Sequence, residues 1–202
     1  LGSWALRTAC ADAAGWPKPL QVSVNVSAIQ FAMEGFPTLV ANVLASTQID
    51  PRRLVLEITE SVFLGDSEAN DKIFRALLDL GVRLSLDDFG TGYSSLSYLS
   101  TSPFEKLKID RSFVERCTER GNKNKAIISA TIGLANALKM EVIVEGVEAF
   151  DQLDLIRSKG GKLVQGWIYS PALPNGEILN RLAQGDFRIA PDGPRRHRPA
   201  RR

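Results

Sequence analysis

The chain has 202 residues, of which 44% are hydrophobic and 24% are charged, and its formal net charge is +2. These proportions are those of a globular domain, so they exclude fibrous and intrinsically disordered proteins. The longest mostly apolar stretch, Ala126 to Leu138, covers 13 residues. A membrane-spanning helix needs about 20. The sequence therefore predicts one domain without a membrane segment.

The charge is distributed unevenly along the chain. From Pro191 onward there are one acid, Asp192, and five arginines (195, 196, 198, 201 and 202), which leaves 20 basic and 22 acidic residues elsewhere. We therefore divide the chain into a domain over 1–184 and a basic Pro- and Arg-rich tail over 185–202. The composition of the tail predicts a solvated, disordered segment rather than one that binds a nucleic-acid polymer stably.

Cys10 and Cys117 show no paired spacing, so neither a disulfide framework nor a cysteine metal site is expected. They are interpreted as thiols in a reducing cytoplasm, since the chain has no secretory signal. The sequence begins at Leu1, within what resembles a helical region, and we expect it to be part of a longer polypeptide.

Six short apolar runs predict strands, because each is leucine-rich or β-branched and bounded by polar or turn residues, as fully buried strands are. They are Val22–Val26, Leu54–Ile58, Val82–Leu86, Lys106–Ile109, Val142–Val144 and Leu163–Gln165. Amphipathic stretches between them predict helices near residues 36–47, 68–80, 95–100, 122–139 and 149–159. Alternating strands and helices indicate an α/β fold with a parallel sheet. Six strands fit either an open doubly wound sheet or an incomplete eight-stranded barrel.

Polar side chains with oxygen ligands end five of the apolar runs: Asn25, Glu57, Asp87, Asp110 and Glu145. A parallel sheet gathers the carboxyl ends of its strands at one edge, where α/β enzymes build their sites. Carboxylates this close repel one another unless cations neutralise them, and oxygen ligands suit Mg²⁺ or Mn²⁺ rather than zinc. The pattern therefore predicts a divalent-metal site.

A plainer interpretation of such acids is that they cap helices or lie solvated in loops. The helix-cap interpretation is favoured for Asp110, which directly precedes Arg111. Five strands that end in the same kind of polar side chain favour a common site instead. Lys108 lies on the same side of its strand as Asp110. Because charged side chains are almost never buried unpaired, we expect Lys108 to contact a carboxylate or a phosphate, and a structural Lys–Glu pair is the simpler alternative.

The segment that follows Asp87 and Asp88 contains Gly90 and Gly92, which free the backbone for a tight loop. It lacks the lysine of a P-loop and the spacing of a dinucleotide fingerprint, so nucleotide binding of those kinds is disfavoured. No Ser–His or His–His arrangement suggests another chemistry, because the single histidine, His197, lies in the basic tail.

Six segments of the chain resemble, in order and spacing, the motifs of EAL domains, a family of cyclic di-GMP phosphodiesterases. They are Asn25-Val-Ser, Leu56-Glu57-Ile-Thr-Glu60, Asp87-Asp88-Phe-Gly-Thr-Gly-Tyr-Ser, Leu107-Lys108-Ile-Asp110, Val144-Glu145-Gly-Val-Glu148 and Gln165-Gly-Trp. The resemblance implies a modified TIM (β/α)8 barrel with one antiparallel strand. It also implies hydrolysis of cyclic di-GMP to linear pGpG with two divalent ions, Mg²⁺ or Mn²⁺.

The resemblance implies a metal-ligating role for four residues. Asn25, Glu57 and Asp87 resemble ligands of the first metal, and Asp87 resembles the carboxylate that bridges to the second. Asp88 resembles a ligand of the second metal. These assignments fall on the strand ends that the apolar pattern already singles out.

The resemblance also assigns five residues to catalysis, substrate binding and loop support. Glu145 matches the carboxylate proposed as general base or second-metal ligand, and Lys108 matches the lysine that contacts the attacking water and the phosphate. Glu60 is similar to the glutamate that holds the Asp-Asp loop. Glu148 and Gln165 match substrate-site residues.

One departure from the family pattern affects the expected activity. In EAL domains a Glu-Ala-Leu strand and a following arginine precede the Asn-Val-Ser strand, and this sequence starts after them. We therefore expect the barrel to be incomplete at its N-terminus, without one first-metal ligand and one substrate arginine. The chain as given is expected to be impaired as an enzyme.

Three hypotheses of function remain open from the sequence. The leading one is metal-dependent hydrolysis of cyclic di-GMP in the cytoplasm, compatible with a homodimer, and the intact Lys108, Glu145 and Asp87-Asp88 favour it. The alternative is a non-catalytic EAL-like module that binds cyclic di-GMP or a protein partner in signalling. The third is an unrelated Mg²⁺ barrel enzyme, such as a lyase of the enolase type.

Overall fold

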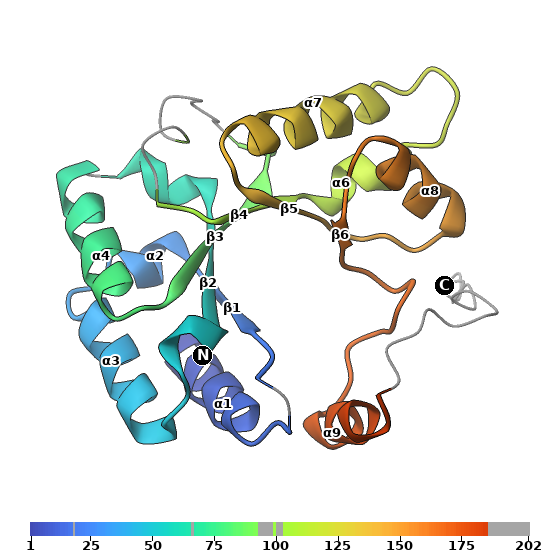
Figure 1. Ribbon diagram of the computed structural model, residues 1–202. Coiled ribbons are helices and arrows are strands. Elements are labelled where there is room, and N and C mark those ends of the chain that lie inside the picture. The colour runs from blue at the N-terminus through green and yellow to red at the C-terminus, as the bar shows by residue number, and fades with distance from the viewer. Residues whose placement is uncertain (18, 66, 93–98, 100–102, 186–202) are drawn as a thin grey trace, which may run out of the picture.

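The computed structural model describes residues 1–17, 19–65, 67–92, 99 and 103–185. Its described strands form one parallel sheet that curves, with helices outside the curve (Figure 1). The strands are β1 (Val22–Val26), β2 (Leu54–Thr59), β3 (Arg83–Phe89), β4 (Lys106–Ile109), β5 (Glu141–Val144) and β6 (Leu163–Val164). The six predicted strands are thus confirmed, with differences of one to three residues at the ends of four of them.

The order of the strands separates the two architectures that the composition leaves open. The sheet runs β1-β2-β3-β4-β5-β6, in the order of the chain. A doubly wound sheet reverses its strand order at a switch point, whereas a βα barrel adds each strand beside the previous one. The described part of the chain therefore has the progression of a TIM-like barrel. The antiparallel strand that the family resemblance implies is not among these six strands.

The predicted helices over 36–47, 68–80, 122–139 and 149–159 are confirmed, and the one near 95–100 falls largely outside the described residues, as does the tail beyond residue 185. The α-helices are α1 (Gly2–Ala14), α2 (Ala28–Phe31), α3 (Phe36–Thr47), α4 (Ser67–Asp79), α6 (Arg111–Val114), α7 (Asn124–Ala137), α8 (Phe150–Ser158) and α9 (Asn175–Gln184). Short 3-10 helices are η1 (Pro51–Arg53) and η2 (Glu60–Leu64). None of the described helices combines the length and the apolar character that crossing a bilayer requires.

The two faces of the sheet differ in chemistry, because successive side chains of a strand point to opposite sides. On β2, Leu54, Leu56 and Ile58 are 0% exposed and belong to the main core under the helices. Glu57 and Thr59 have the opposite parity and lie on the inner, concave face. The prediction of fully buried strands is confirmed for β2, in which Leu54 to Ile58 are all buried, although the inner face includes the charged side chain of Glu57.

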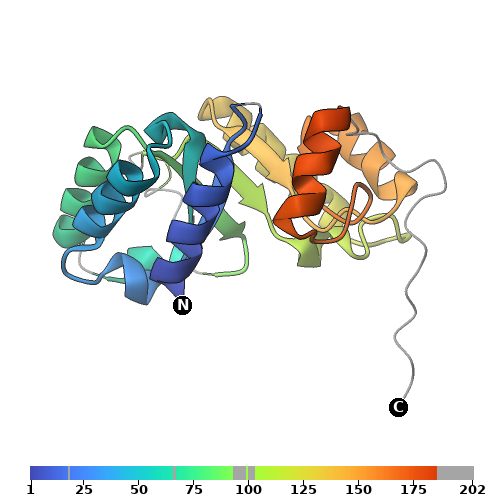
Figure 2. The same ribbon diagram turned by 90° about the horizontal axis from the view of Figure 1, so that it is seen from below.

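A cluster of phenylalanines supports the segments that follow β1 and β2. Phe74 of α4 packs against Phe31 of α2 with ring centroids 4.8 Å apart and against Phe104 at 5.5 Å. Phe63 of η2 meets Phe104 edge to face at 6.0 Å. Such ring pairs add directional packing to the burial of apolar area. They fix α2 and η2 beside the carboxyl ends of β1 and β2 (Figure 2).

Candidate functional site

Lys108 lies at the centre of the inner face, with only 2% of its side chain exposed. Its Nζ atom lies 2.6 Å from Glu57 Oε2, 2.7 Å from Glu145 Oε1 and 3.0 Å from Asp87 Oδ1. The three carboxylates come from β2, from the residue after β5, and from β3. The predicted carboxylate partner of Lys108 is therefore confirmed. The ammonium group pairs with carboxylates from three segments of the chain rather than with a single glutamate.

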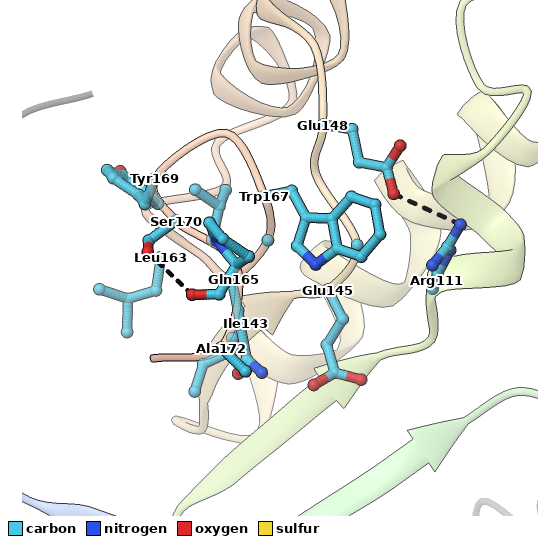
Figure 3. Close-up of a pocket in the computed structure, with 14 residues that line it drawn as sticks. Arg111, Ile143, Glu145, Glu148, Leu163, Gln165, Trp167, Tyr169, Ser170 and Ala172 are labelled. Carbon is cyan, nitrogen blue, oxygen red and sulfur yellow. Dashed lines mark hydrogen bonds and ion pairs between the residues drawn. The ribbon is translucent and has the colours of Figure 1, made fainter. Parts of the chain in front are cut away.

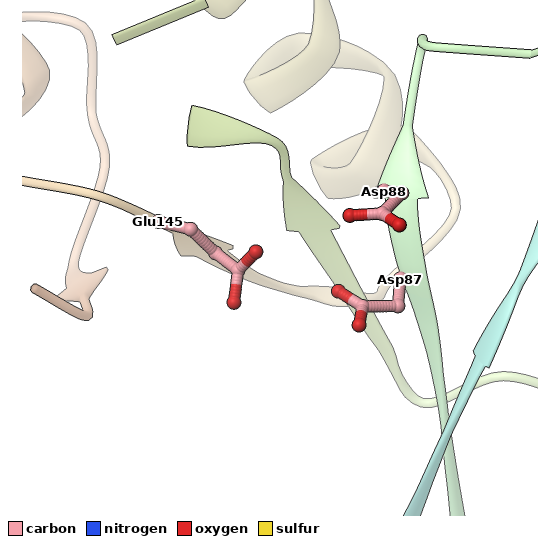
Figure 4. Close-up of side chains that lie close together, drawn as sticks. All are labelled: Asp87, Asp88 and Glu145. Carbon is pink, nitrogen blue, oxygen red and sulfur yellow. The ribbon is translucent and has the colours of Figure 1, made fainter. Parts of the chain in front are cut away.

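The adjacent aspartates reach the same site because β3 bulges at this point. Its pairing with β4 shifts register between Leu86 and Phe89, so that Asp87 and Asp88 together oppose the single residue Lys108. Asp88 has a φ of 55°, in the left-handed region that Asp tolerates better than most residues. A bulge of this kind breaks the strict alternation of side chains. Both carboxylates consequently turn toward the inner face, as Figure 4 shows.

Asp87, Asp88 and Glu145 form a group that fits a divalent cation. Each offers one carboxylate oxygen, and these oxygens lie within 4.8 Å of one another (Figure 4). With Glu57 the group has four carboxylates, three of which pair with the single ammonium of Lys108, and the five side chains carry a formal charge of −3. Hard oxygen ligands with excess negative charge match the preference of Mg²⁺ and Mn²⁺.

The environment alters the acidity of three of these groups. Burial raises the pKa of Asp88, and the neighbouring carboxylates of Asp87 and Asp110 raise it further. Burial also raises the pKa of Glu145, and the hydrogen bond from Lys108 opposes this without reversing it. For Lys108 burial lowers the pKa, but its bonds to Glu145 and Glu57 outweigh burial and hold the pKa above its ordinary value. The site thus keeps its lysine charged and retains carboxyls of raised proton affinity.

Two further predicted residues lie at the border of this cluster. Asn25 stands beside Glu57 in the register of β1 and β2, at the exposed edge of the described sheet. Glu60 accepts a hydrogen bond of 2.8 Å from the backbone N–H of Gly90, two residues after Asp88. Glu60 therefore contacts the loop that the sequence assigns to it, and not the Lys108 ammonium.

Asp110 plays the part of a helix cap. Its Oδ1 atom accepts a hydrogen bond of 3.0 Å from the backbone N–H of Ser112, at the start of α6. The interpretation that the sequence favours for this residue is confirmed. The strand-end pattern also needs a correction for Glu57 and Asp87, which lie inside their strands, two residues before Thr59 and Phe89.

A cavity of about 810 Å³ opens beside the cluster, and Glu145 lines both (Figure 3). The predicted substrate-site residues Glu148 and Gln165 lie in its wall. So do two residues to which the sequence gave no role, Arg111 and Trp167. The remaining lining residues are Ile143, Gly146, Leu163, Val164, Gly166, Tyr169, Ser170, Pro171 and Ala172. Volumes of this size accept a ligand of nucleotide dimensions.

The fold and the inner face thus define a barrel-type α/β protein with a cluster of carboxylates near the carboxyl ends of its strands. The sequence model of the EAL domain matches residues 1–172. The chain belongs to the EAL domain family.

Characterised relatives support this membership. MucR of Pseudomonas aeruginosa, a bifunctional diguanylate cyclase and cyclic di-GMP phosphodiesterase, is 36% identical over 187 residues, which are 91% of this chain and 27% of MucR. The chain spans 22% to 27% of the length of the first curated relatives it matches. It therefore corresponds to one part of these larger proteins.

Solved structures agree with the sequence comparison. The EAL domain of Mycobacterium smegmatis DcpA has a TM-score of 0.85 and 36% identity, over 92% of this chain and 85% of that one. The MucR phosphodiesterase in complex with cyclic di-GMP has a TM-score of 0.83 and 36% identity, over 88% and 73% of the two chains. Klebsiella pneumoniae BlrP1, in a manganese and cyclic di-GMP complex, has a TM-score of 0.78 and 26% identity, over 86% and 45%.

Proposed function

We propose that this chain carries a phosphodiesterase site that hydrolyses cyclic di-GMP to linear pGpG with two divalent cations, Mg²⁺ or Mn²⁺. The observation that supports this most is the cluster of Asp87, Asp88 and Glu145, of which Asp87 and Glu145 pair with the Lys108 ammonium. Relatives that are named as cyclic di-GMP phosphodiesterases support the same reaction. We place the reaction in the cytoplasm, where the unpaired thiols of Cys10 and Cys117 stay reduced.

In this proposal Asn25, Glu57 and Asp87 hold one cation, and Asp87 and Asp88 hold the other. The present contacts leave room for such ligation, because Lys108 engages one oxygen of Glu57 and one of Asp87. The second oxygen of each carboxylate is not in an ion pair with Lys108. When bound, two cations supply a water of lowered pKa and offset the charge of the phosphodiester.

The remaining steps belong to side chains of the protein. Glu145 takes the proton of the attacking water, and its raised pKa makes its carboxylate a stronger base than an ordinary glutamate. Lys108 orients Glu145 through their 2.7 Å contact and donates to the phosphate oxygens as negative charge develops on them. Glu60 steadies the loop after Asp88 through the backbone of Gly90.

The test is a cyclic di-GMP hydrolysis assay with chromatographic detection of pGpG in Mg²⁺, Mn²⁺ or EDTA. It is run on this chain and on the longest polypeptide that its gene encodes. In the active form, Glu145→Gln is expected to lower kcat about 100-fold or more while it spares binding, because it keeps the shape and removes the base.

Glu119→Gln is the matched control for this substitution, since Glu119 is an exposed acid that pairs with Arg116 on the surface. Its kcat is expected to equal that of the wild type. If both polypeptides bind cyclic di-GMP and neither cleaves it with any metal, the hydrolytic proposal fails. The non-catalytic binding module then takes its place.

A further inference from the structure

We propose that Asn70 of α4 is a positioning residue for the acid cluster. Its side chain holds η2 in place, η2 carries Glu60, and Glu60 holds the loop that follows Asp88. Asn70 lies outside the six motifs that the chain shares with EAL domains. The inference rests on the proposed function for the role of the cluster. It concerns how the protein holds that loop, and one of its two measurements needs neither metal nor substrate.

Asn70 is a polar residue on the apolar face of its helix. The buried side chains of α4 are Asn70, Phe74 and Leu77, whose spacing puts them on one stripe. This stripe faces the core, because α4 lies outside the curve of the sheet (Figure 1). Only 8% of Asn70 is exposed. Asparagine is a poorer helix former than leucine, and a buried amide costs free energy unless it is hydrogen-bonded. Natural proteins break such local rules mainly where function requires it.

The amide of Asn70 ties η2 to α4. Its Nδ2 atom donates to the carbonyl oxygen of Val62 over 2.7 Å. The same oxygen accepts the backbone N–H of Gly65 over 3.3 Å, at the end of η2. Phe63 also packs on Phe74, with ring centroids 6.4 Å apart. This apolar contact is non-directional, whereas a hydrogen bond fixes both distance and direction. Asn70 therefore sets the position of η2 against α4.

The side chain of Glu60 connects η2 to the loop after β3. Glu60 is the first residue of η2 and accepts the hydrogen bond of 2.8 Å from the backbone N–H of Gly90. A Cβ atom on Gly92 would lie 3.0 Å from Glu60 Oε2, so the loop passes close around this carboxylate. Thr91 Oγ1 in turn donates to the carbonyl oxygen of Asp88 over 2.8 Å. A shift of Glu60 therefore moves the backbone that carries the Asp88 carboxylate.

A cavity between η2 and the loop makes this connection decisive. It has a volume of about 260 Å³ and is lined by Ser61 and Leu64 on the side of η2, and by Asp88 and Thr91 on the side of the loop. Close packing transmits position only where atoms are in contact. Across this cavity the loop depends on the hydrogen bond to Glu60 instead. The position of η2, and hence the bond from Asn70, therefore matters for the acid cluster.

The first measurement is Mn²⁺ binding to the full chain, followed by the electron paramagnetic resonance signal of free Mn²⁺. Asn70→Leu keeps a branched side chain on the apolar stripe and removes the donor. Its stability should stay close to that of the wild type, because apolar burial offsets the lost hydrogen bond. Its affinity for Mn²⁺ should fall about three- to tenfold, as expected when support for a ligand is lost. Asn70→Ala, which cannot clash, should show the same loss of affinity.

Leu77→Ala is the matched control, since Leu77 is buried on the same stripe of α4. It should lower the stability of the protein through lost burial and a cavity. The Mn²⁺ affinity of the folded protein should equal that of the wild type, because Leu77 does not contact η2 through a hydrogen bond that an alanine would remove. A merely structural role of Asn70 would give the opposite pattern, in which affinity changes only as stability does.

The second measurement is the hydrogen exchange of the Gly90 amide, followed by NMR in EDTA. Since this N–H donates to Glu60, its exchange reports the loop directly. Exchange at Gly90 should be about fivefold faster or more in Asn70→Leu and Asn70→Ala than in the wild type. The amide of Leu56, in the middle of β2, should exchange in Asn70→Leu as it does in the wild type. Leu77→Ala should leave the exchange at Gly90 unchanged.

The outcomes separate this inference from the proposed function. Asn70 variants with the Mn²⁺ affinity or the Gly90 exchange of the wild type overturn the inference, and so do equal effects in Leu77→Ala. If the wild type binds no Mn²⁺, the proposed metal site fails. Faster exchange at Gly90 then still supports the role of Asn70 in holding the loop, and unchanged exchange overturns it. A protein that shows both Asn70 effects but never cleaves cyclic di-GMP contradicts the hydrolytic proposal alone.

Discussion

The two faces of the sheet are stabilised by different interactions, although their residues alternate along single strands. The outer face carries Leu54, Leu56 and Ile58, which are 0% exposed among other apolar side chains. The inner face of the same strand carries Glu57, whose buried negative charge is compensated by the ammonium of Lys108. Stability on the outer face comes from apolar area and close packing. On the inner face it depends on whether charges are compensated.

This contrast explains how one short strand can serve both the core and the site. A step of one residue, from Leu56 to Glu57, moves from the main hydrophobic core to the candidate metal centre. The two faces are expected to fail in different ways when they are mutated. A substitution on the outer face should lower the free energy of unfolding without changing the response to ligand. A substitution on the inner face should change the response to ligand, and it should also lower the free energy of unfolding where it leaves buried charges uncompensated.

The largest expected effect is on the inner face, in Lys108→Met. Removal of the ammonium leaves the carboxylates of Glu57, Asp87 and Glu145 buried together without their counter-ion. The free energy of unfolding in EDTA should fall by about 3–5 kcal/mol, measured by urea denaturation. Lys106→Met is the matched control, because Lys106 occupies the same strand and face. Its ion pair is with a mostly exposed acid, Glu141, and the expected loss is about 1 kcal/mol or less. Equal losses in the two variants would contradict the central role of Lys108.

The second prediction compares neighbours on opposite faces. Leu56→Ala should lower the free energy of unfolding by about 2–5 kcal/mol through lost burial and a cavity. Its folded fraction should keep the thermal stabilisation by Mn²⁺ that we expect of the wild type. Glu57→Gln should reduce that stabilisation, since it removes a proposed ligand charge. Scanning calorimetry with and without Mn²⁺ measures both quantities. A Leu56→Ala variant that loses its Mn²⁺ response would show that the faces are not independent.

The third prediction concerns the metal alone. A cation that binds only the folded state at 100 times its Kd stabilises that state by about 2.7 kcal/mol. Asp87→Asn should abolish most of this gain, because Asp87 is the proposed bridging ligand. Asp79→Asn, an exposed acid at the end of α4, is the control and should respond to Mg²⁺ as the wild type does. The same rise in Tm for both variants would remove Asp87 from the metal site.

The smallest expected effect on stability is that of Asp88→Gly, which tests the bulge. Glycine adopts the φ of 55° at this position without a Cβ penalty, so stability should change by no more than about 1 kcal/mol. Asp88→Ala should be less stable than Asp88→Gly by about 1 kcal/mol. Both variants should bind Mn²⁺ more weakly than the wild type. An alanine variant as stable as the glycine variant would argue against the left-handed conformation at Asp88.

Sequence patterns predict the elements and most of the cluster because these depend on local alternation. The runs Val22–Val26 and Lys106–Ile109 are strands with those bounds, and Asp110 caps a helix as its neighbours indicate. Glu57, Asp87 and Glu145 converge because parallel strands place their carboxyl ends together. The helical region expected at the start of the sequence is α1, whereas α9 is missed although its stretch is amphipathic.

Features that depend on contacts between distant segments could not be predicted in the same way. The bulge at Asp88 arises from the pairing of β3 with β4, and the adjacent acids alone do not reveal that both face inward. The single carboxylate or phosphate partner expected for Lys108 becomes three because β2, β3 and β5 meet there. The contact of Arg111 with Glu148 depends on the missing side chain of Gly146, a detail of tertiary packing.

The central claim is that the inner face binds divalent cations at the acid cluster beside Lys108. Anomalous diffraction from crystals grown with Mn²⁺ and cyclic di-GMP tests it most directly. The account predicts manganese at coordination distance, about 2.0–2.6 Å, from carboxylate oxygens of Asp87 and Asp88. Crystals saturated with Mn²⁺ that show no anomalous peak at these aspartates, with Lys108 still bound to its three carboxylates, would contradict the account.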